Sequence, residues 1–396
     1  MSRKKKVMVI GHEASLSGAP VLLLNLFKLL KEKGIVDVQF VIRRGGPLVE
    51  QYKEFAPVIV LKPPKYGEEK TVALHVVHWV ENKIKMLQVF LNAFLCDYLF
   101  FNTVVNGRLL RWFHFHHKPV ITYVHELEKV IDLYLRKNDA VLPLSISDVI
   151  AYPSCLTQSL LTNKYKIPER KLKKLSYYFP FSEDEYDAVK GADMGKKFRQ
   201  QFNIHETDFL VGAVGMVSER KGFDLFIEVC EKVVSINSSI KFVWIGSFES
   251  NEQELMVREM IKAKQLQENL VFTGPLRYDV YNFSPFDIFF LSSREDTYPL
   301  VVLEAAIMKI PTICFSDSGG IVEFVGDNAG WSIGDFSTSK AANKILELNG
   351  DKDLIGLAGN NAFKKVISLH CNEDRIINQY ISLVEDLFKK RQAGLG

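Results

Sequence analysis

Three carboxylates occur close together between residues 291 and 306, in a pattern suited to binding a ligand. Glu295 and Asp296 lie in a polar loop after an apolar run, and Glu304 lies inside Leu300–Ile307, where every other residue is apolar. A helix over this run would partly bury Glu304, and a buried carboxylate costs free energy unless a donor group meets it. The two hydroxyl groups of a ribose would supply such donors.

Glu304 also has an interpretation that involves no ligand. Arg294 precedes it and Lys309 follows it, so either cation could form a helix-internal salt bridge with it. Structural ion pairs tolerate partial burial, and this alternative therefore stays open at the level of the sequence.

Adjacent cations follow a glycine-rich turn in segment 212–222. The apolar run ends at Gly215, and Arg220 and Lys221 stand where a helix would open. An ammonium group near a helix start is a good phosphate ligand, so Lys221 could neutralise a diphosphate. The alternative is a solvated lysine beside a turn. Neither a P-loop nor a Gly-x-Gly-x-x-Gly fingerprint follows a strand, which disfavours kinases, ATPases and dehydrogenases.

The elements that must position these residues alternate along the chain. Short β-branched runs and longer amphipathic stretches predict βαβ units around parallel sheets, with ligands beyond the carboxyl ends of the strands. The expected strands are Val7–His12, Val38–Ile42, Val58–Leu61, Tyr98–Thr103, Val120–His125, Asp148–Pro153, Phe209–Gly215, Lys241–Gly246, Leu270–Thr273, Asp287–Ser292 and Thr312–Phe315. The expected helices include Pro20–Lys33, Lys221–Val234, Glu252–Ala263, Leu300–Lys309 and Gly320–Val325.

The length of 396 residues suits two domains, each with its own core. We expect an α/β fold with an N-terminal Rossmann-like domain over 1–182 and a C-terminal one over 183–372. The polar stretches Ser182–Asp187 and Lys196–Arg199 mark the expected linker. A last helix within 373–396 is expected to pack back on the first domain.

The composition indicates a folded globular protein in a reducing compartment. Hydrophobic residues make up 47% of the chain, and a net charge of +3 is too small to predict nucleic-acid binding. Five scattered cysteines predict free thiols, and the start of the chain lacks signal-peptide features. Polar residues interrupt Met86–Phe101, so we expect a buried helix leading into a strand and a cytoplasmic protein whose membrane contact, if any, is peripheral.

The two chemistry-bearing segments resemble the retaining glycosyltransferases of family four, which have the GT-B architecture of two facing Rossmann-like domains. The family signature is an acidic residue, seven intervening residues and a glutamate, followed by a strand and a Gly-Gly turn. Asp296 and Glu304 have that spacing, and Pro311–Phe315 is the strand. The resemblance implies that Glu304 binds the ribose, that Asp296 contacts the donor sugar, and that turn amides face the sugar or phosphate. The turn residues are Ser318, Gly319 and Gly320.

This chain departs from the family pattern at two places. Glu295 stands beside Asp296, so the sequence leaves open which carboxylate reaches the sugar. The family commonly has arginine after the glycine of the phosphate loop, where this chain has Met216 after Gly215. Arg220 is a candidate replacement for that arginine.

In the first domain the resemblance rests on two places. Gly18, in Ser15–Ala19, matches the family's glycine loop, and His125 matches its cleft histidine. The implied catalytic role of His125 is a hydrogen bond to a sugar hydroxyl, and the alternative is a strand-end histidine that caps the next helix.

A cationic and aromatic stretch, Arg108–Lys118, contains three histidines, but no carboxylate or cysteine at metal-ligand spacing. We expect an acceptor-facing or membrane-facing surface there, with core packing as the alternative. No metal or cofactor is expected, and Asp351–Asp353, the single Asp-x-Asp, is interpreted as a solvated turn.

The resulting hypothesis is a metal-independent retaining glycosyltransferase. It would move a sugar from a nucleotide-diphosphate sugar to a hydroxyl of a glycan or lipid-linked acceptor. The alternatives are a sugar-nucleotide epimerase, a phosphorylase, or a non-catalytic protein that binds a sugar or sugar nucleotide on the same fold, and Met216 slightly favours the last.

Overall fold

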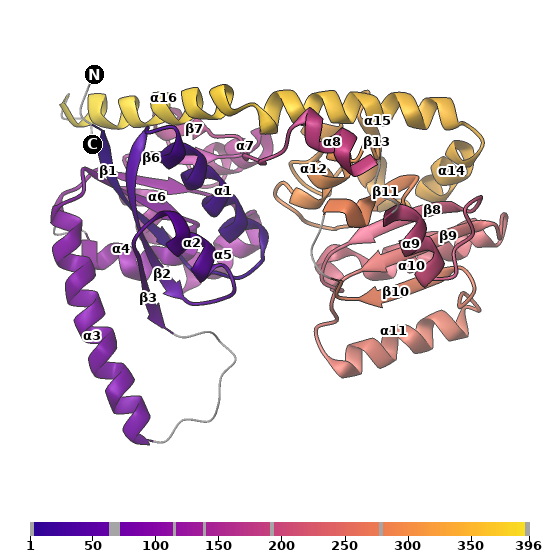
Figure 1. The fold of residues 1–396 in the computed structure, drawn as a ribbon, viewed down its shortest axis with the longest axis horizontal. Coiled ribbons are helices and arrows are strands. Elements are labelled where there is room, and N and C mark those ends of the chain that lie inside the picture. The colour runs from indigo at the N-terminus through magenta and orange to yellow at the C-terminus, as the bar shows by residue number, and fades with distance from the viewer. Residues whose placement is uncertain are drawn as a thin grey trace. The chain divides into compact units, whose positions relative to one another are not determined.

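A computed structural model describes residues 4–62, 72–113, 116–137, 140–190, 194–276 and 280–392. The chain divides into two compact units (Figure 1). Unit 1 comprises Met1–Pro180 together with Asn372–Gly396, and unit 2 comprises Phe181–Cys371. The structural division after Pro180 lies close to the boundary that the sequence suggests after residue 182.

Unit 1 contains a seven-stranded sheet whose pairings are all parallel. The strand order is β3-β2-β1-β4-β5-β6-β7, with β4 in the middle. The strands are β1 Lys5–Gly11, β2 Val36–Arg44, β3 Val58–Lys62, β4 Tyr98–Asn102, β5 Val120–Tyr123, β6 Val149–Tyr152 and β7 Leu172–Lys174. The helices are α1 Gly18–Glu32, α2 Val49–Phe55, α3 Val72–Phe94, α4 Gly107–Phe113, α5 Glu128–Arg136, α6 Val141–Ile146, α7 Cys155–Asn163 and α16 Glu373–Gln392.

Unit 2 contains a six-stranded parallel sheet in the order β10-β9-β8-β11-β12-β13. The strands are β8 Phe209–Val214, β9 Ile240–Ile245, β10 Leu270–Gly274, β11 Ile288–Leu291, β12 Thr312–Phe315 and β13 Gly330–Ile333. The helices are α8 Glu183–Lys190, α9 Met194–Gln201, α10 Phe223–Val234, α11 Asn251–Ala263, α12 Leu300–Ile307, α13 Val322–Val325, α14 Thr338–Asn349 and α15 Lys352–Val366. The predicted α/β class, with two Rossmann-like parallel sheets, is confirmed.

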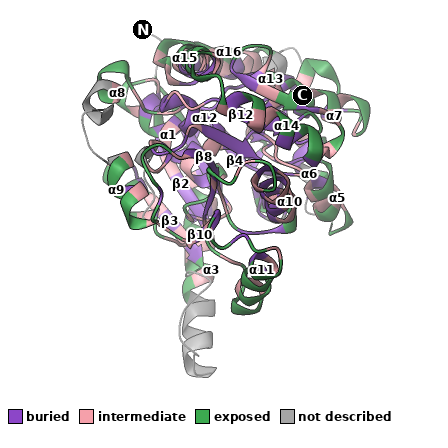
Figure 2. Ribbon diagram, turned by 90° about the vertical axis from the view of Figure 1, so that its right-hand side faces the viewer, coloured by how far each residue is buried: buried purple, intermediate pink, exposed green. Residues whose placement is uncertain are grey.

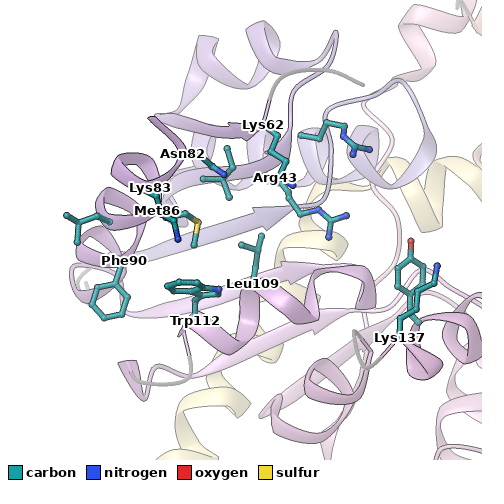
Figure 3. Close-up of a pocket in the computed structure, with 13 residues that line it drawn as sticks. Arg43, Lys62, Asn82, Lys83, Met86, Phe90, Leu109, Trp112 and Lys137 are labelled. Atoms are coloured by element: carbon teal, nitrogen blue, oxygen red, sulfur yellow. The ribbon is translucent and has the colours of Figure 1, made fainter. Parts of the chain in front are cut away.

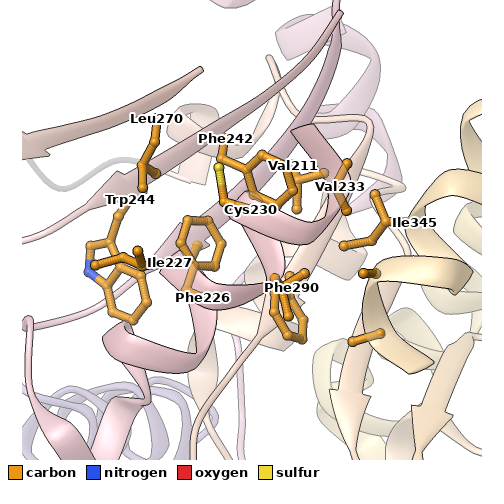
Figure 4. Close-up of a cluster of buried hydrophobic side chains, with 14 of the residues drawn as sticks. Val211, Phe226, Ile227, Cys230, Val233, Phe242, Trp244, Leu270, Phe290 and Ile345 are labelled. Atoms are coloured by element: carbon orange, nitrogen blue, oxygen red, sulfur yellow. The ribbon is translucent and has the colours of Figure 1, made fainter. Parts of the chain in front are cut away.

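The strands are nearly continuous apolar runs because helices cover both faces of each sheet. In unit 2, Phe226 of α10 packs on Phe242 and Trp244 of β9 and on Phe290 of β11, with ring centroids 5.2 to 5.9 Å apart (Figure 4). Figure 2 shows buried strands such as β8 and β4, and exposed outer surfaces on helices such as α11 and α5. These cores fix the strand ends from which the site loops start.

Several element boundaries differ from the sequence prediction. Helix α10 begins at Phe223 rather than Lys221, because Gly222 adopts a left-handed conformation (φ 71°) and ends a short 3-10 turn. The edge strands β7 and β13 were missed, since short edge strands carry little periodic signal. The expected linker stretches instead form α8 and α9, and Asp351, expected in a solvated turn, caps α15 by accepting a hydrogen bond from the Leu354 amide at 2.9 Å.

The C-terminal helix α16 packs on unit 1. The Tyr380 hydroxyl lies 2.5 Å from the Tyr98 hydroxyl, and the Tyr380 ring meets Phe27 edge-on at 5.8 Å. Lys33 and Glu373 form an ion pair at the start of the helix. The last segment of the chain therefore contributes to the core of the first unit.

Helix α3 corrects the prediction of a buried helix between Met86 and Phe101. Its inner residues Val89 and Ala93 are buried, but Leu87 and Leu91 are 59% and 55% exposed. No helix in the described part of the chain is long and apolar enough to cross a bilayer.

Candidate active site

The loop after β8 forms a compact turn that presents Lys221. Gly215 directly follows the strand with φ 148°, and it is succeeded by a short 3-10 turn over Glu219–Lys221, capped by the Ser218 side chain. A Cβ on Gly222 would lie 2.0 Å from the Ser292 carbonyl oxygen, so only glycine fits there. The tight turn therefore packs directly against the loop that follows β11.

Both cations of that turn, Arg220 and Lys221, lie close to the Asp296 carboxylate. Lys221 forms an ion pair with the Asp296 carboxylate, and Arg220 Nη1 lies 3.6 Å from the same Oδ2 atom. Arg220 also donates to the Glu295 carbonyl oxygen at 2.8 Å. The Lys221 and Asp296 side chains are only 16% and 14% exposed, so their attraction is weakly screened. Asp296, rather than the neighbouring Glu295, is thus the carboxylate at the cations.

Backbone hydrogen bonds join the first two loops to each other. The Arg294 amide donates to the Arg220 carbonyl at 2.9 Å, and the Ser292 hydroxyl donates to the Lys221 carbonyl at 3.0 Å. Met216, at the family's usual arginine position, is exposed, whereas Arg220 stands beside Lys221 and Asp296. Arg220 is therefore placed to act as the second cation.

The Gly319-Gly320 turn after β12 holds the Asp296 loop. The Asp296 amide donates to the Ser318 carbonyl at 2.7 Å, and the Gly320 amide donates to the Thr297 carbonyl at 3.0 Å. A Cβ on Gly319 would lie 1.6 Å from the Asp296 carbonyl oxygen. The sequence predicts that these amides face a donor, but the Gly320 amide already binds Thr297 and so serves to position the loop.

Glu304 lies on α12 and is only 1% exposed. Arg294 binds Asp224 through two hydrogen bonds of 2.7 and 2.5 Å, and the Lys309 ammonium lies 4.2 Å from the centroid of the Tyr186 ring. The two cations of the salt-bridge alternative are therefore engaged elsewhere.

Comparisons with known proteins agree with this arrangement. Residues 195–365 match the profile of the family described as glycosyl transferases group 1. The matched residues lie within the C-terminal unit. The crystal structure of Anabaena HepE in complex with UDP-glucose superposes with a TM-score of 0.78 at 15% identity, covering 97% of this chain and 100% of that one. The chain has the GT-B fold of such glycosyltransferases, and the group 1 domain is its unit 2.

Two curated relatives come from Staphylococcus aureus. The poly(ribitol-phosphate) alpha-N-acetylglucosaminyltransferase of strain COL is 27% identical over 179 residues, which make up 45% of this chain and 36% of that protein. The capsular polysaccharide biosynthesis glycosyltransferase CapM is 24% identical over 272 residues, 67% of this chain and 68% of that protein. The chain thus spans about a third of the length of the first relative.

The predicted residues of the first domain lie at strand ends in unit 1, not in the group 1 domain. Gly18 is the exposed first residue of α1. Before it, the Ser15 hydroxyl donates to Glu13 Oε1 at 2.7 Å and lies 2.8 Å from the Ser17 hydroxyl. This loop therefore offers hydroxyl groups at a helix start.

His125 follows β5, and protein groups contact both of its ring nitrogens. Nε2 lies 2.7 Å from Asn102 Oδ1 and Nδ1 lies 3.2 Å from the Tyr177 hydroxyl. Because the Asn102 Nδ2 group donates to the Ala19 carbonyl, its Oδ1 accepts, and His125 Nε2 carries the proton. Burial lowers the pKa of His125 to about 3, so the ring is neutral. Helix α5 starts after an N-cap at Leu127, so His125 does not cap it.

Three neighbours of His125 were not predicted from the sequence. His12 directly follows β1, and its pKa is also lowered. Burial lowers this pKa most, Glu13 raises it, and Arg43 lowers it further. Asn102 ends β4, and Tyr177 follows β7. A polar residue at the last position of a buried strand, or directly after it, is the sequence signal that would identify Asn102 and His12. Tyr177 lies in an irregular segment, where no such signal exists.

One histidine of the cationic and aromatic stretch Arg108–Lys118, His116, packs against α3 and has a structural role. His116 stacks on Phe94 at 4.2 Å, and its Nε2 lies 2.7 Å from the Phe90 carbonyl oxygen. The described residues contain no group of three or more potential metal ligands. His114, Phe115 and the Arg108 side chain lie outside the described residues.

Proposed function

We propose that this chain is a retaining glycosyltransferase that moves a sugar from a nucleotide-diphosphate sugar to a hydroxyl of a glycan or lipid-linked acceptor at the cytoplasmic membrane face. The observation that carries the proposal is the meeting of Lys221, Arg220 and Asp296 at the strand ends of the group 1 domain. The complex of HepE with UDP-glucose supports the donor class, and the Staphylococcus relatives support a glycan acceptor.

Cleavage of the sugar–phosphate bond develops negative charge on the leaving diphosphate. Lys221 and Arg220 are preorganised to stabilise that charge, because hydrogen bonds from Ser292 and Arg294 already fix the loop that carries them. An arriving diphosphate competes with Asp296 for Lys221. The displaced carboxylate is then free to bind a hydroxyl of the donor sugar, while Glu304 accepts from the ribose hydroxyls.

The acceptor hydroxyl must lose a proton during transfer. His125 is a poor proton acceptor at neutral pH, because burial lowers its pKa to about 3. In a retaining transfer the leaving diphosphate oxygen takes this proton, as the acceptor attacks from the same side. His125 then acts as a neutral hydrogen-bonding group, and the reaction needs no divalent metal.

The test begins with a thermal-shift screen of nucleoside diphosphates and their sugars. A ligand present at a hundred times its dissociation constant adds about 2.7 kcal/mol to stability. NMR of the product made from the matching donor then gives its anomeric configuration. A product of inverted configuration would overturn the retaining mechanism. Conversion of the donor sugar without an acceptor would identify an epimerase, and binding without turnover would identify a non-catalytic protein.

A further inference from the structure

Unit 1 contains a large cavity beside the strand-end cluster of His12 and His125. Its volume is about 1090 Å³, and its walls come from the ends of β2 and β3 and from α3, α4 and α5 (Figure 3). Ligand pockets commonly measure about 300 to 1,000 Å³, so this one suits an extended molecule rather than a single small ion. Arg43 joins the two regions, since it lines the cavity and lowers the pKa of His12.

The walls carry strong positive charge. Five of the described lining residues are cations and none is a carboxylate. The cations are Arg43, Arg44, Lys62, Lys83 and Lys137.

Two of these cations are neighbours on adjacent strands. Arg44 and Lys62 are register partners on β2 and β3, which lie about 4.8 Å apart as adjacent strands do. Neither forms an ion pair with any residue that the structure describes. Two like charges this close repel each other, and an anion bound between them would relieve the repulsion.

Apart from Asn82 and Tyr134, the other lining residues are apolar, and this apolar wall continues into an exposed stripe. Met86, Phe90 and Trp112 line the cavity, and Trp112 is 55% exposed (Figure 3). The exposed apolar side chains of α3 recur at helical spacing along one face. They are Ile84, Leu87, Leu91 and Phe94, followed directly after the helix by Leu95, and they are between 54% and 70% exposed. Leu87 belongs to both the cavity wall and the stripe.

We propose that this cavity binds the phosphate group of a membrane lipid, whose hydrocarbon chain lies against the α3 stripe. Arginine and lysine side chains are the residues that bind phosphate, and an apolar face bordered by cations is suited to an anionic bilayer. A second copy of this chain fits less well, because Lys85 on α3 and Lys118, which donates to the Phe94 carbonyl oxygen at 3.1 Å, border the stripe and would face the same cations on the partner.

The inference deepens the proposed function and rests on it for one point, that the bound lipid is a carrier of the acceptor. Two binding experiments test the cavity itself. Co-sedimentation measures partition to phosphatidylcholine vesicles with and without phosphatidic acid. Thermal shift measures binding of dihexanoyl phosphatidic acid below the concentration at which it forms micelles.

Three paired variants separate charge from apolar contact. The cavity variant combines Arg44→Gln with Lys62→Gln, and the stripe variant combines Ile84→Ser with Leu91→Ser. The control combines Lys28→Gln with Lys166→Gln, two exposed lysines elsewhere in unit 1. Each cation near an anionic surface contributes about a factor of five to binding, so the cavity variant should lose about 30-fold in vesicle partition.

The expected pattern is specific. The cavity variant weakens binding of both the vesicles and the short-chain lipid. The stripe variant loses the vesicles but keeps the short-chain lipid, and the control behaves as wild type. Equal partition to vesicles without phosphatidic acid, or wild-type binding by the cavity variant, would overturn the proposal. Binding of a soluble polyphosphate without any vesicle binding would instead assign the cavity to a water-soluble polyanion.

Nucleoside diphosphate binding, measured on the same four proteins, separates this inference from the proposed function. It should be unchanged in all variants, since no altered residue lies in the group 1 domain. Lipid binding without nucleotide binding would mean that the proposed function alone fails. Nucleotide binding without lipid binding would mean that the inference alone fails.

Discussion

The strand-end loops of the two units differ in the kind of polar group that they present. In the group 1 domain the loops present paired charges, with Lys221 and Arg220 around Asp296. In unit 1 the ends of β4 and β5 present neutral groups, Asn102 and the hydrogen-bonded ring of His125, and the cations lie instead at the ends of β2 and β3. The same architecture therefore supports two different electrostatic environments.

This difference matches the chemistry that we propose. A leaving diphosphate carries negative charge, which fixed cations stabilise best when they are held in place before reaction. An acceptor hydroxyl is neutral, and a neutral imidazole can bind it without the cost of burying a charge. Five predictions test this contrast, from the largest expected effect to the smallest.

The largest effect is expected from Glu304→Gln. Loss of the carboxylate removes charge-assisted hydrogen bonds to two ribose hydroxyls, so transfer should fall about a thousandfold. The melting temperature should stay within a few degrees of wild type. Steady-state kinetics and thermal unfolding measure the two quantities, with Glu259→Gln on the surface of α11 as the control. Near-normal turnover with a large loss of melting temperature would show that Glu304 is structural.

Gly319→Ala should lower the rate of transfer by displacing the loop that carries Asp296. The new methyl group would lie 1.6 Å from the Asp296 carbonyl oxygen, so one of the two loops must move. A displacement of about 1 Å at a reacting group costs roughly a hundredfold in rate. Gly356→Ala on α15, where a Cβ meets nothing within 4 Å, is the matched control and should leave activity unchanged. Equal activities of the two variants would contradict the role of this turn.

Lys221→Ala tests the cationic half of the comparison. A charge-assisted hydrogen bond contributes about 1.5 to 3 kcal/mol, so nucleoside diphosphate affinity should fall about 10- to 100-fold. Affinity for the nucleoside should hardly change, as isothermal titration calorimetry can establish. Lys262→Ala on the exposed face of α11 is the control. Equal losses for both ligands would place Lys221 away from the phosphates.

Glu126 tests whether the strand-end region around His125 favours neutral groups, because burial raises the pKa of Glu126 to about 7. The folded state therefore holds the proton more tightly than the unfolded state. The resulting stabilisation is fully present below the unfolded pKa and is lost as the pH rises through about 7. Relative to Glu126→Gln, the wild type should gain about 2 kcal/mol between pH 7 and pH 5.

Urea unfolding of both proteins at the two pH values measures this difference, and contributions common to them cancel. The surface change Glu259→Gln should show no such pH dependence. A gain toward higher pH in the wild type would mean that Glu126 is ionised in the folded state.

The smallest expected effect is that of a chelator. If Lys221 and Arg220 alone balance the diphosphate charge, EDTA should leave the rate of transfer unchanged. The rate is measured before and after dialysis against EDTA, with magnesium or manganese added back. Loss of activity that either ion restores would show that the cations of this loop are insufficient.

The sequence alone determined the elements and the local motifs. Apolar periodicity placed the central strands, since a strand buried on both faces must be apolar throughout. The spacing of Asp296 and Glu304 and the glycines at 319 and 320 are also local facts, and they pointed to the loops that meet in the group 1 domain.

Only the tertiary structure decided which side chains meet. It selected Asp296 over Glu295, directed Arg294 to Asp224, and brought Asn102 and Tyr177 to His125. It also exposed one face of α3, which the sequence predicts to be buried. Such contacts depend on where strands distant in sequence end side by side and on which helix faces are covered, and periodicity within one segment carries no information about either.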